Sequence, residues 1–104
     1  MLNEGATNAL YQDVTGDVAN MALATTVKQS IASFKQKCTH SAVEIKSFKT
    51  YIACKQDAAV PYEGQVLMAE AAGADVVALE CGHSPFLKGE ESAKLVAIIA
   101  SIAL

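Results

Sequence analysis

The chain has 104 residues, of which 52% are hydrophobic and 6% aromatic, and it carries 11 acidic against 8 basic side chains for a net charge of -3. This composition is typical of one globular domain and excludes the fibrous and disordered classes. Because the basic residues are outnumbered and form no cluster, it also argues against a surface that binds nucleic acid.

The N-terminal sequence MLNEGATNALYQD contains no basic segment followed by an apolar stretch, which a signal peptide would need. The longest apolar run, LVAIIASIAL, is too short to cross a bilayer. The three cysteines, Cys38, Cys54 and Cys81, are an odd number, so we expect buried free thiols rather than a disulfide framework. Together these features predict a cytoplasmic protein without a membrane partner.

Residues 6–37 have the pattern of short, modestly amphipathic helices. We expect these helices at 6–14, 15–27 and 28–37. Thr15 stands where the second of them would have its N-cap, with Asp17 in the first turn. The following residues, 39–50, are polar and mixed, which predicts a connector that leads into a strand.

The second part of the chain alternates between apolar runs and helical segments. TYIAC (50–54) and ADVVALE (74–80) are nearly continuous apolar runs, which predict strands buried on both faces. Between them, residues 61–72 have apolar side chains at helical spacing, and Gly73 follows where a helix C-cap would fall.

A closing helix is predicted over 89–104. Its acidic residues Glu90 and Glu91 lie in the first turn, where they favour the helix dipole and are expected to be solvated. Its apolar face would pack on a sheet in a complete α/β fold, and in this short chain we expect part of that face to be exposed and to invite self-association.

The order strand, helix, strand, helix predicts an α/β fold with two parallel strands joined by a right-handed crossover. Sheets usually have about four to six strands, and two strands alone leave unpaired edges. The predicted unit therefore looks like the end of a larger α/β sheet.

ECGHSPF, residues 80–86, begins like the G-x-S-x-G nucleophile elbow of serine hydrolases. The residue after Ser84 is Pro85, however, which has no N–H to offer an oxyanion hole, and the final glycine is replaced by Phe86. Ser84 is thus a poor nucleophile candidate. The stretch is better interpreted as a loop that presents His83 at the end of a strand, with Gly82 providing backbone freedom.

An acid stands in the equivalent place after the preceding strand. Asp57, in KQDAAVP, and His83 should both project from the carboxyl ends of adjacent parallel strands, where open α/β sheets bind ligands. A histidine that acts as a base needs an acid to hold its tautomer, so the pair has a chemical reason to lie together.

These motifs resemble the C-terminal part of the α/β-hydrolase fold, most of all the small esterase group of methylesterases and hydroxynitrile lyases. The resemblance covers 50–104 through QDAAVP and GHSPF, while LYQDV (10–14) and KQSIASF (28–34) are similar to the helical lid of that group. It implies one domain with a partial α/β-hydrolase fold. Residues 1–49 would be lid-like helices and connector, and 50–104 the last two βα units.

The resemblance also implies roles for particular residues. Asp57 would be the triad acid and His83 the general base, while Phe86 and Leu87 would lie near the substrate pocket and Tyr11 on the lid. The group hydrolyses small esters without a cofactor.

The sequence contains no G-x-S-x-G and begins, with Met1, inside the segment that resembles the lid. We therefore expect a chain that is inactive alone, and that joins small-ester hydrolysis only if another polypeptide supplies the serine. The alternative is a truncated, non-catalytic fragment that binds a hydrolase chain or a second copy of itself. The sequence leaves the substrate, the oligomeric state and the true start of the gene product open.

Two other features of the sequence bear on its chemistry. Cys38-Thr39-His40 and Cys81-Gly82-His83 are C-x-H pairs whose thiolates and imidazoles could hold zinc, although the spacing differs from that of common zinc modules. The remaining serines lack an elbow pattern and are expected to be surface or capping hydroxyls. They are Ser30, Ser33, Ser41, Ser47, Ser92 and Ser101.

Overall fold

The structure, a computed structural model, describes residues 5–103. The helices and strands lie at α1 Gly5–Leu10, α2 Gly16–Ala24, α3 Ala32–Lys35, β1 Thr50–Cys54, α4 Tyr62–Ala72, β2 Asp75–Leu79 and α5 Gly89–Ile102. Two 3-10 turns accompany them, η1 at Ala42–Glu44 and η2 at Pro85–Leu87. The order of the predicted βαβα unit is confirmed, with strand and helix ends within two residues of expectation.

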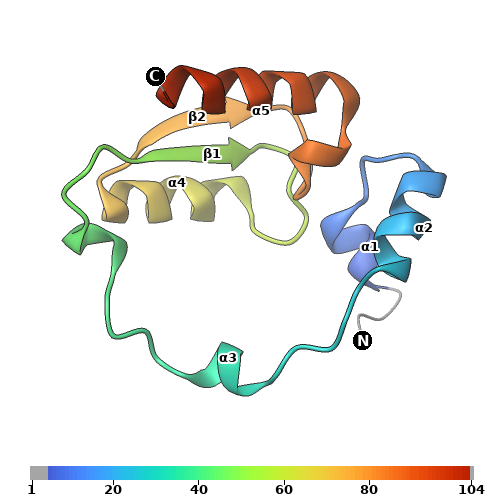
Figure 1. The fold of residues 1–104 in the computed structure, drawn as a ribbon, viewed down its shortest axis with the longest axis horizontal. Coiled ribbons are helices and arrows are strands. Elements are labelled where there is room, and N and C mark those ends of the chain that lie inside the picture. The colour runs from blue at the N-terminus through green and yellow to red at the C-terminus, as the bar shows by residue number, and fades with distance from the viewer. Residues whose placement is uncertain (1–4, 104) are drawn as a thin grey trace.

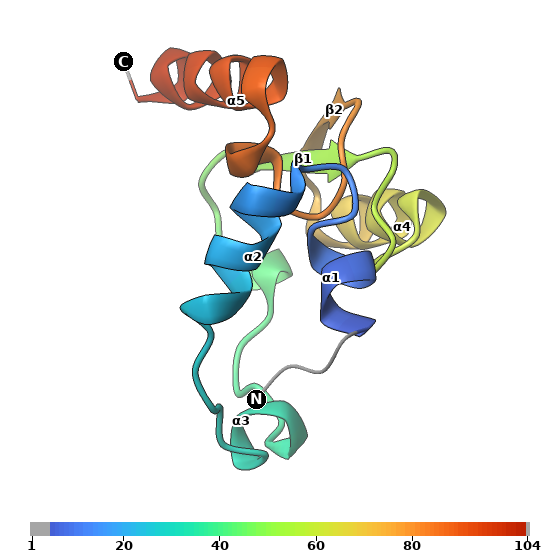
Figure 2. The same ribbon diagram turned by 90° about the vertical axis from the view of Figure 1, so that its right-hand side faces the viewer.

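β1 and β2 form a parallel pair in which Thr50 lies opposite Asp75 and Cys54 opposite Leu79. Helix α4 connects them along one face of the pair, and α5 covers the other face, so the unit has three layers (Figure 1). The structure confirms a partial α/β fold. Both strands end at the side of the molecule where α1 and α2 lie (Figures 1 and 2).

Local chemistry explains where α4 ends. Gly73 adopts a left-handed conformation with φ 68°, which glycine tolerates without the steric penalty of a Cβ. Its N–H donates to the carbonyl of Glu70 at 3.0 Å, and the N–H of Ala74 donates to that of Ala69 at 2.9 Å. The helix therefore closes its last turn where the sequence predicted a C-cap.

The helices of the first part are shorter than predicted. Helix α2 ends at Ala24, where the hydroxyls of Thr25 and Thr26 donate to the carbonyls of Ala22 and Leu23. Helix α3 is a single turn. Threonine hydroxyls compete with the helix for its own carbonyls, which is why the expected continuation to residue 27 fails. Thr15 is the N-cap residue of α2, but its side chain makes no capping hydrogen bond.

The hydrophobic core is small and lies near the carboxyl ends of the strands. It consists of Cys54, Leu79 and Cys81, against which three partly buried residues pack: Ile52, Leu95 and Ile98. The expectation that both faces of each strand are buried holds only at the end of β1, where Ala53 and Cys54 are buried. It is wrong for β2, where Val76 is 39% exposed and only Leu79 is buried. With a single neighbouring strand and one helix on each face, the start of β2 has too little structure around it to exclude water.

The molecule exposes more surface than a folded monomer of its size. Its accessible area is 7641 Å², whereas about 5,600 Å² is expected from the scaling of surface with mass. Its radius of gyration is 15.2 Å, against about 13 Å for a compact domain of this length. As predicted, α5 presents an uncovered apolar stripe, in which Val96, Ile99 and Ile102 are 55 to 65% exposed.

Between residues 5 and 103, no helix combines the length and the apolar character that crossing a bilayer would require.

Candidate functional site

Asp57 is held by the loop that follows β1. Its Oδ1 accepts the backbone N–H groups of Ala59, at 2.7 Å, and Val60, at 2.9 Å, so the carboxylate closes a tight turn over its own loop. The side chain is only 5% exposed. The second oxygen, Oδ2, is left to face the loop that follows β2.

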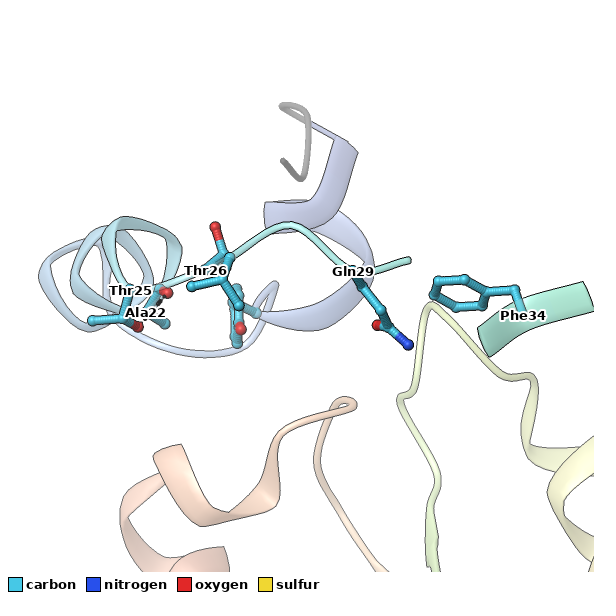
Figure 3. A pocket seen from close by; sticks show the side chains of 7 residues that line it. Ala22, Thr25, Thr26, Gln29 and Phe34 are labelled. Atoms are coloured by element: carbon cyan, nitrogen blue, oxygen red, sulfur yellow. Dashed lines mark hydrogen bonds between the residues drawn. The ribbon is translucent and has the colours of Figure 1, made fainter. Parts of the chain in front are cut away.

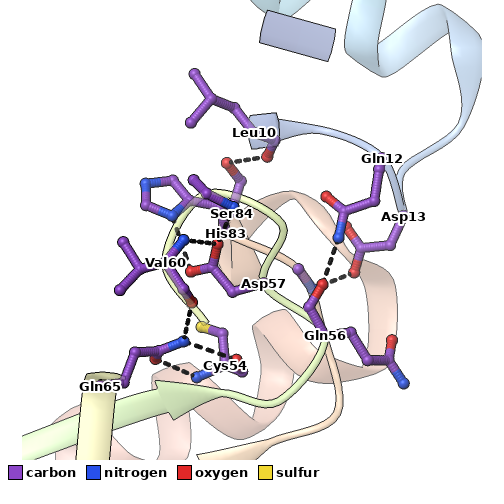
Figure 4. A network of polar contacts seen from close by, with 12 residues as sticks. Leu10, Gln12, Asp13, Cys54, Gln56, Asp57, Val60, Gln65, His83 and Ser84 are labelled. Carbon is purple, nitrogen blue, oxygen red and sulfur yellow. Dashed lines mark hydrogen bonds and ion pairs between the residues drawn. The ribbon is translucent and has the colours of Figure 1, made fainter. Parts of the chain in front are cut away.

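His83 meets that second oxygen. Its Nδ1 lies 2.9 Å from Asp57 Oδ2, as Figure 4 shows, and its side chain is 40% exposed. An ionised carboxylate can only accept, so the contact places a proton on Nδ1 and leaves Nε2 with its lone pair. The structure thus brings the two residues predicted from the sequence together, with a shielded acid and a ring open to solvent.

Opposing effects act on the pKa of Asp57. Burial raises it, while the hydrogen bonds from the Val60 N–H, from His83 and from the Ala59 N–H lower it. Together the hydrogen bonds outweigh burial and hold the pKa below its usual value of 3.8. Asp57 is therefore ionised near neutral pH, as an acceptor for His83 Nδ1–H must be.

This lowered pKa predicts a pH dependence of stability. A carboxyl whose pKa is lower in the folded chain stabilises the fold above its usual pKa, and this contribution is lost as the pH falls through the folded value. We expect the free energy of unfolding to decrease as the pH falls below about 4, and to decrease less in Asp57→Asn. Urea unfolding between pH 7 and pH 3 measures both. Equal losses in the two proteins would contradict this assignment, since Glu91, whose pKa is also lowered, would then carry the effect.

The segment after α1 binds both loops, a feature that the sequence did not reveal. The Gln12 amide donates to the carbonyl of Gln56, and Asp13 Oδ2 accepts the N–H of Gly82 at 2.6 Å (Figure 4). Lys88 approaches the same Asp13 oxygen at 3.4 Å. These contacts draw Gln12 and Asp13 out of the helix predicted over 6–14, so α1 ends at Leu10.

The reason for glycine at position 82 also differs from the expectation. Among the described residues only Gly73 has a positive φ, so Gly82 does not need the backbone freedom of glycine. A Cβ at this position would lie 2.7 Å from the Gln12 amide and 2.8 Å from Asp13 Oδ1. Gly82 therefore permits the close approach of the segment that carries Gln12 and Asp13.

Ser84, the serine of the elbow-like motif, is 3% exposed. Its hydroxyl donates to the carbonyl of Leu10 at 2.9 Å. The side chain thus ties the end of α1 to the histidine loop, and its oxygen faces neither His83 nor solvent.

Tyr11 lines a cavity of about 510 Å³ between α2 and the segment that follows it (Figure 3). The other lining residues are Ala22, Thr25, Thr26, Val27, Gln29 and Phe34. Phe86 and Leu87 do not line it. They lie in η2, directly after the histidine loop, where Phe86 is 64% exposed. Their contact with a substrate stays a prediction.

The cysteines divide into two kinds. Cys54 and Cys81 are buried, as expected, whereas Cys38 is exposed, contrary to expectation, because it lies in the connector, away from the core. Burial raises the pKa of both core thiols, that of Cys81 to about 12. Among residues 5–103 no three His, Cys, Asp or Glu side chains lie close enough to hold a metal ion, so the two C-x-H pairs do not form the four-ligand cluster that the zinc interpretation needs.

Exposure and thiol pKa predict a clear order of cysteine reactivity. The thiolate is the reactive form, so Cys38 should react rapidly with Ellman's reagent in the native chain, and Cys54 and Cys81 only after denaturation. The expected stoichiometry is one fast thiol per chain, and a Cys38→Ser control should have none. Rapid reaction of a second thiol in the folded chain would contradict the packing of the core.

Glu91 differs from the expectation of a solvated side chain, since it is 5% exposed. Its Oε2 accepts the N–H of Glu80 at 3.1 Å, and its Oε1 pairs with Lys94 at 2.7 Å. Together with Lys88, which donates to the carbonyl of Glu80, it satisfies the backbone where β2 ends. The acidic residue in the first turn of α5 therefore anchors the helix to the strand.

The comparisons with known proteins point in the same direction as the site. The curated protein named Alpha/beta hydrolase nvfD, from Aspergillus novofumigatus (strain IBT 16806), is 33% identical to this chain over 87 residues. The match takes in 81% of this chain and 34% of that protein, so the chain spans about a third of the length of its curated relative. No family model and no solved structure matches the chain. The chain is therefore similar to an α/β-hydrolase over most of its length, which supports the superfamily and no narrower group within it.

Proposed function

We propose that this chain is the acid and histidine portion of a small-ester hydrolase that uses a Ser-His-Asp mechanism. The observation that carries the proposal is the 2.9 Å contact between His83 Nδ1 and Asp57 Oδ2, at the carboxyl ends of adjacent parallel strands. Ligands bind at this end of open α/β sheets. The relative's printed name, alpha/beta hydrolase, agrees with the same chemistry.

In the proposed reaction, His83 Nε2 takes the proton of a serine hydroxyl as that oxygen attacks the ester carbonyl. Asp57 holds the ring in the correct tautomer and stabilises the imidazolium that forms. His83 then gives the proton to the leaving alkoxide. In the second half of the reaction a water molecule gives a proton to His83 Nε2 as it attacks the acyl carbonyl, and His83 returns that proton to the serine oxygen as the carboxylic acid leaves. In this proposal a further polypeptide segment supplies the serine and the oxyanion donors. Ser84 is not available as the nucleophile, because its hydroxyl donates a hydrogen bond to the carbonyl of Leu10.

Two features support a partner segment. The chain exposes about 2,000 Å² more surface than expected for a folded monomer, an area comparable to that of a stable interface. Its sheet has two strands, so each strand has an edge that the other does not cover. We propose that the serine-bearing part of an α/β-hydrolase covers this surface.

The experiment compares three samples with a short-chain p-nitrophenyl ester. They are the 104-residue chain, the part of the Aspergillus relative that lies outside its match to this chain, and the two covalently joined as a chimera. We expect hydrolysis only by the chimera, with loss of activity in its His83→Ala form. If the 104-residue chain hydrolyses the ester alone and His83→Ala abolishes this activity, the chain contains a nucleophile of its own. An inactive but folded chimera would refute the proposal.

A second candidate function is self-association without catalysis. The uncovered stripe of Val96, Ile99 and Ile102 on α5 favours it, because contiguous exposed apolar side chains mark interaction sites. Sedimentation of the chain should then show a dimer that Ile99→Lys dissociates. The matched control is Ala97→Lys, which adds the same charge to an exposed position on the other side of the helix. A monomer at all concentrations would eliminate this candidate.

A further inference from the structure

Gln65 on α4 is a buried polar side chain, 2% exposed, with every group of its amide in use. Its Oε1 accepts the backbone N–H of Cys54 at 2.8 Å. Its Nε2 donates twice, to the carbonyl of Cys54 at 2.9 Å and to that of Val60 at 2.8 Å (Figure 4). A primary amide has two N–H groups, and both have found an acceptor.

The bonds to Cys54 replace those of a neighbouring strand. The next residue, Lys55, donates its N–H across to Leu79 of β2, while both backbone groups of Cys54 are directed to Gln65. The side-chain amide therefore behaves as one peptide unit of an extra strand at the end of β1. It fixes the point at which the chain leaves the sheet.

The third hydrogen bond connects Gln65 to Asp57 through Val60. Val60 accepts from Gln65 through its carbonyl and donates its N–H to Asp57 Oδ1 at 2.9 Å. One side chain thus binds both ends of the loop 54–60, and Asp57 stands between them. The opposite carboxylate oxygen of Asp57 faces His83.

We propose that Gln65 is a positioning residue, which orients the Asp57 carboxylate toward His83 by bonding both ends of the loop that carries it. The inference rests on the proposed function for its purpose, though the hydrogen bonds themselves do not. Without the amide, the buried Cys54 N–H and the part-buried Val60 carbonyl lose their partner, and the Cys54 carbonyl keeps only the Asp57 N–H at 3.3 Å, so the loop must move to find others. Asp57 then leaves the geometry in which it receives the His83 Nδ1–H.

The test follows the tautomer of His83 by ¹⁵N NMR of the imidazole nitrogens in the 104-residue chain. The near-isosteric change Gln65→Met removes all three hydrogen bonds and keeps an unbranched side chain. We expect neutral His83 to change from mainly Nδ1–H to a mixture in which Nε2–H is substantial. The matched control, Gln36→Met, makes the same change at an exposed position and should leave the His83 signals unchanged.

A second variant addresses the possibility that Gln65→Met does not fold. Gln65→Glu keeps an acceptor for the Cys54 N–H, but a carboxylate cannot donate to the two carbonyls and a protonated acid has one O–H for both, so it should also shift the tautomer. A folded variant with the wild-type tautomer would overturn the proposal. Loss of the fold in both variants would do so as well, since Gln65 would then serve global stability.

The NMR signal does not depend on ester hydrolysis. If the wild-type chain has His83 as Nδ1–H but no chimera is active, the proposed function fails and the positioning role stands. In an active chimera, Gln65→Met should lower kcat by about a hundredfold with little change in KM, because a misplaced acid affects the transition state more than substrate binding.

Discussion

Replacing His83 with alanine in the active chimera is expected to lower kcat for ester hydrolysis by about 10⁶-fold, the usual effect of removing a triad base. Asp57→Asn should lower it by about 10⁴-fold, because an amide can hold the wrong tautomer without disturbing the fold. The smaller effect of the acid reflects its role, which is to orient the ring at 2.9 Å rather than to transfer the proton.

The other histidine of the chain supplies the control. His40 is also paired with a carboxylate, Glu44 Oε2 at 3.0 Å, but it lies on the exposed connector. His40→Ala should leave kcat unchanged. Equal effects of the two histidine variants would mean that the assay reports stability, and an unaffected His83→Ala chimera would remove His83 from the mechanism.

Gly82→Ala is expected to destabilise the chain by about 1 to 3 kcal/mol and to release the segment around Asp13. The added Cβ would meet the Gln12 amide and Asp13 Oδ1 at 2.7 to 2.8 Å. These side-chain ends can move only by giving up the bonds to Gln56 and to the Gly82 N–H. The loss of a charge-assisted bond accounts for most of the expected change.

Two measurements test this prediction. Urea unfolding should show the loss of stability, and hydrogen exchange at the residue 82 amide should become faster. Gly64→Ala is the control: nothing lies within 4 Å of its added Cβ, and alanine in a helix should stabilise by about 0.5 to 1 kcal/mol. In an Asp13→Ala background the effect of Gly82→Ala should shrink markedly, and an undiminished effect would refute the contact as its cause.

Local patterns were sufficient for the second part of the chain. The apolar runs at 50–54 and 74–80 predicted both strands, and Gly73 predicted the end of α4, because each depends on neighbouring residues alone. The meeting of Asp57 with His83 was also predictable. Two residues that follow adjacent parallel strands must emerge at the same edge of the sheet, whatever the loops do in detail.

Local sequence patterns thus predict the βαβα order and the edge at which the acid and the histidine meet. They do not predict the three contacts that hold this edge, which join residues distant in sequence: Asp13 to Gly82, Gln65 to Cys54 and Glu91 to Glu80. In each contact a polar side chain satisfies a backbone N–H eleven or more positions away. Periodicity reports the face that a residue occupies, but it does not reveal which backbone groups distant in sequence will need a partner once the chain has folded.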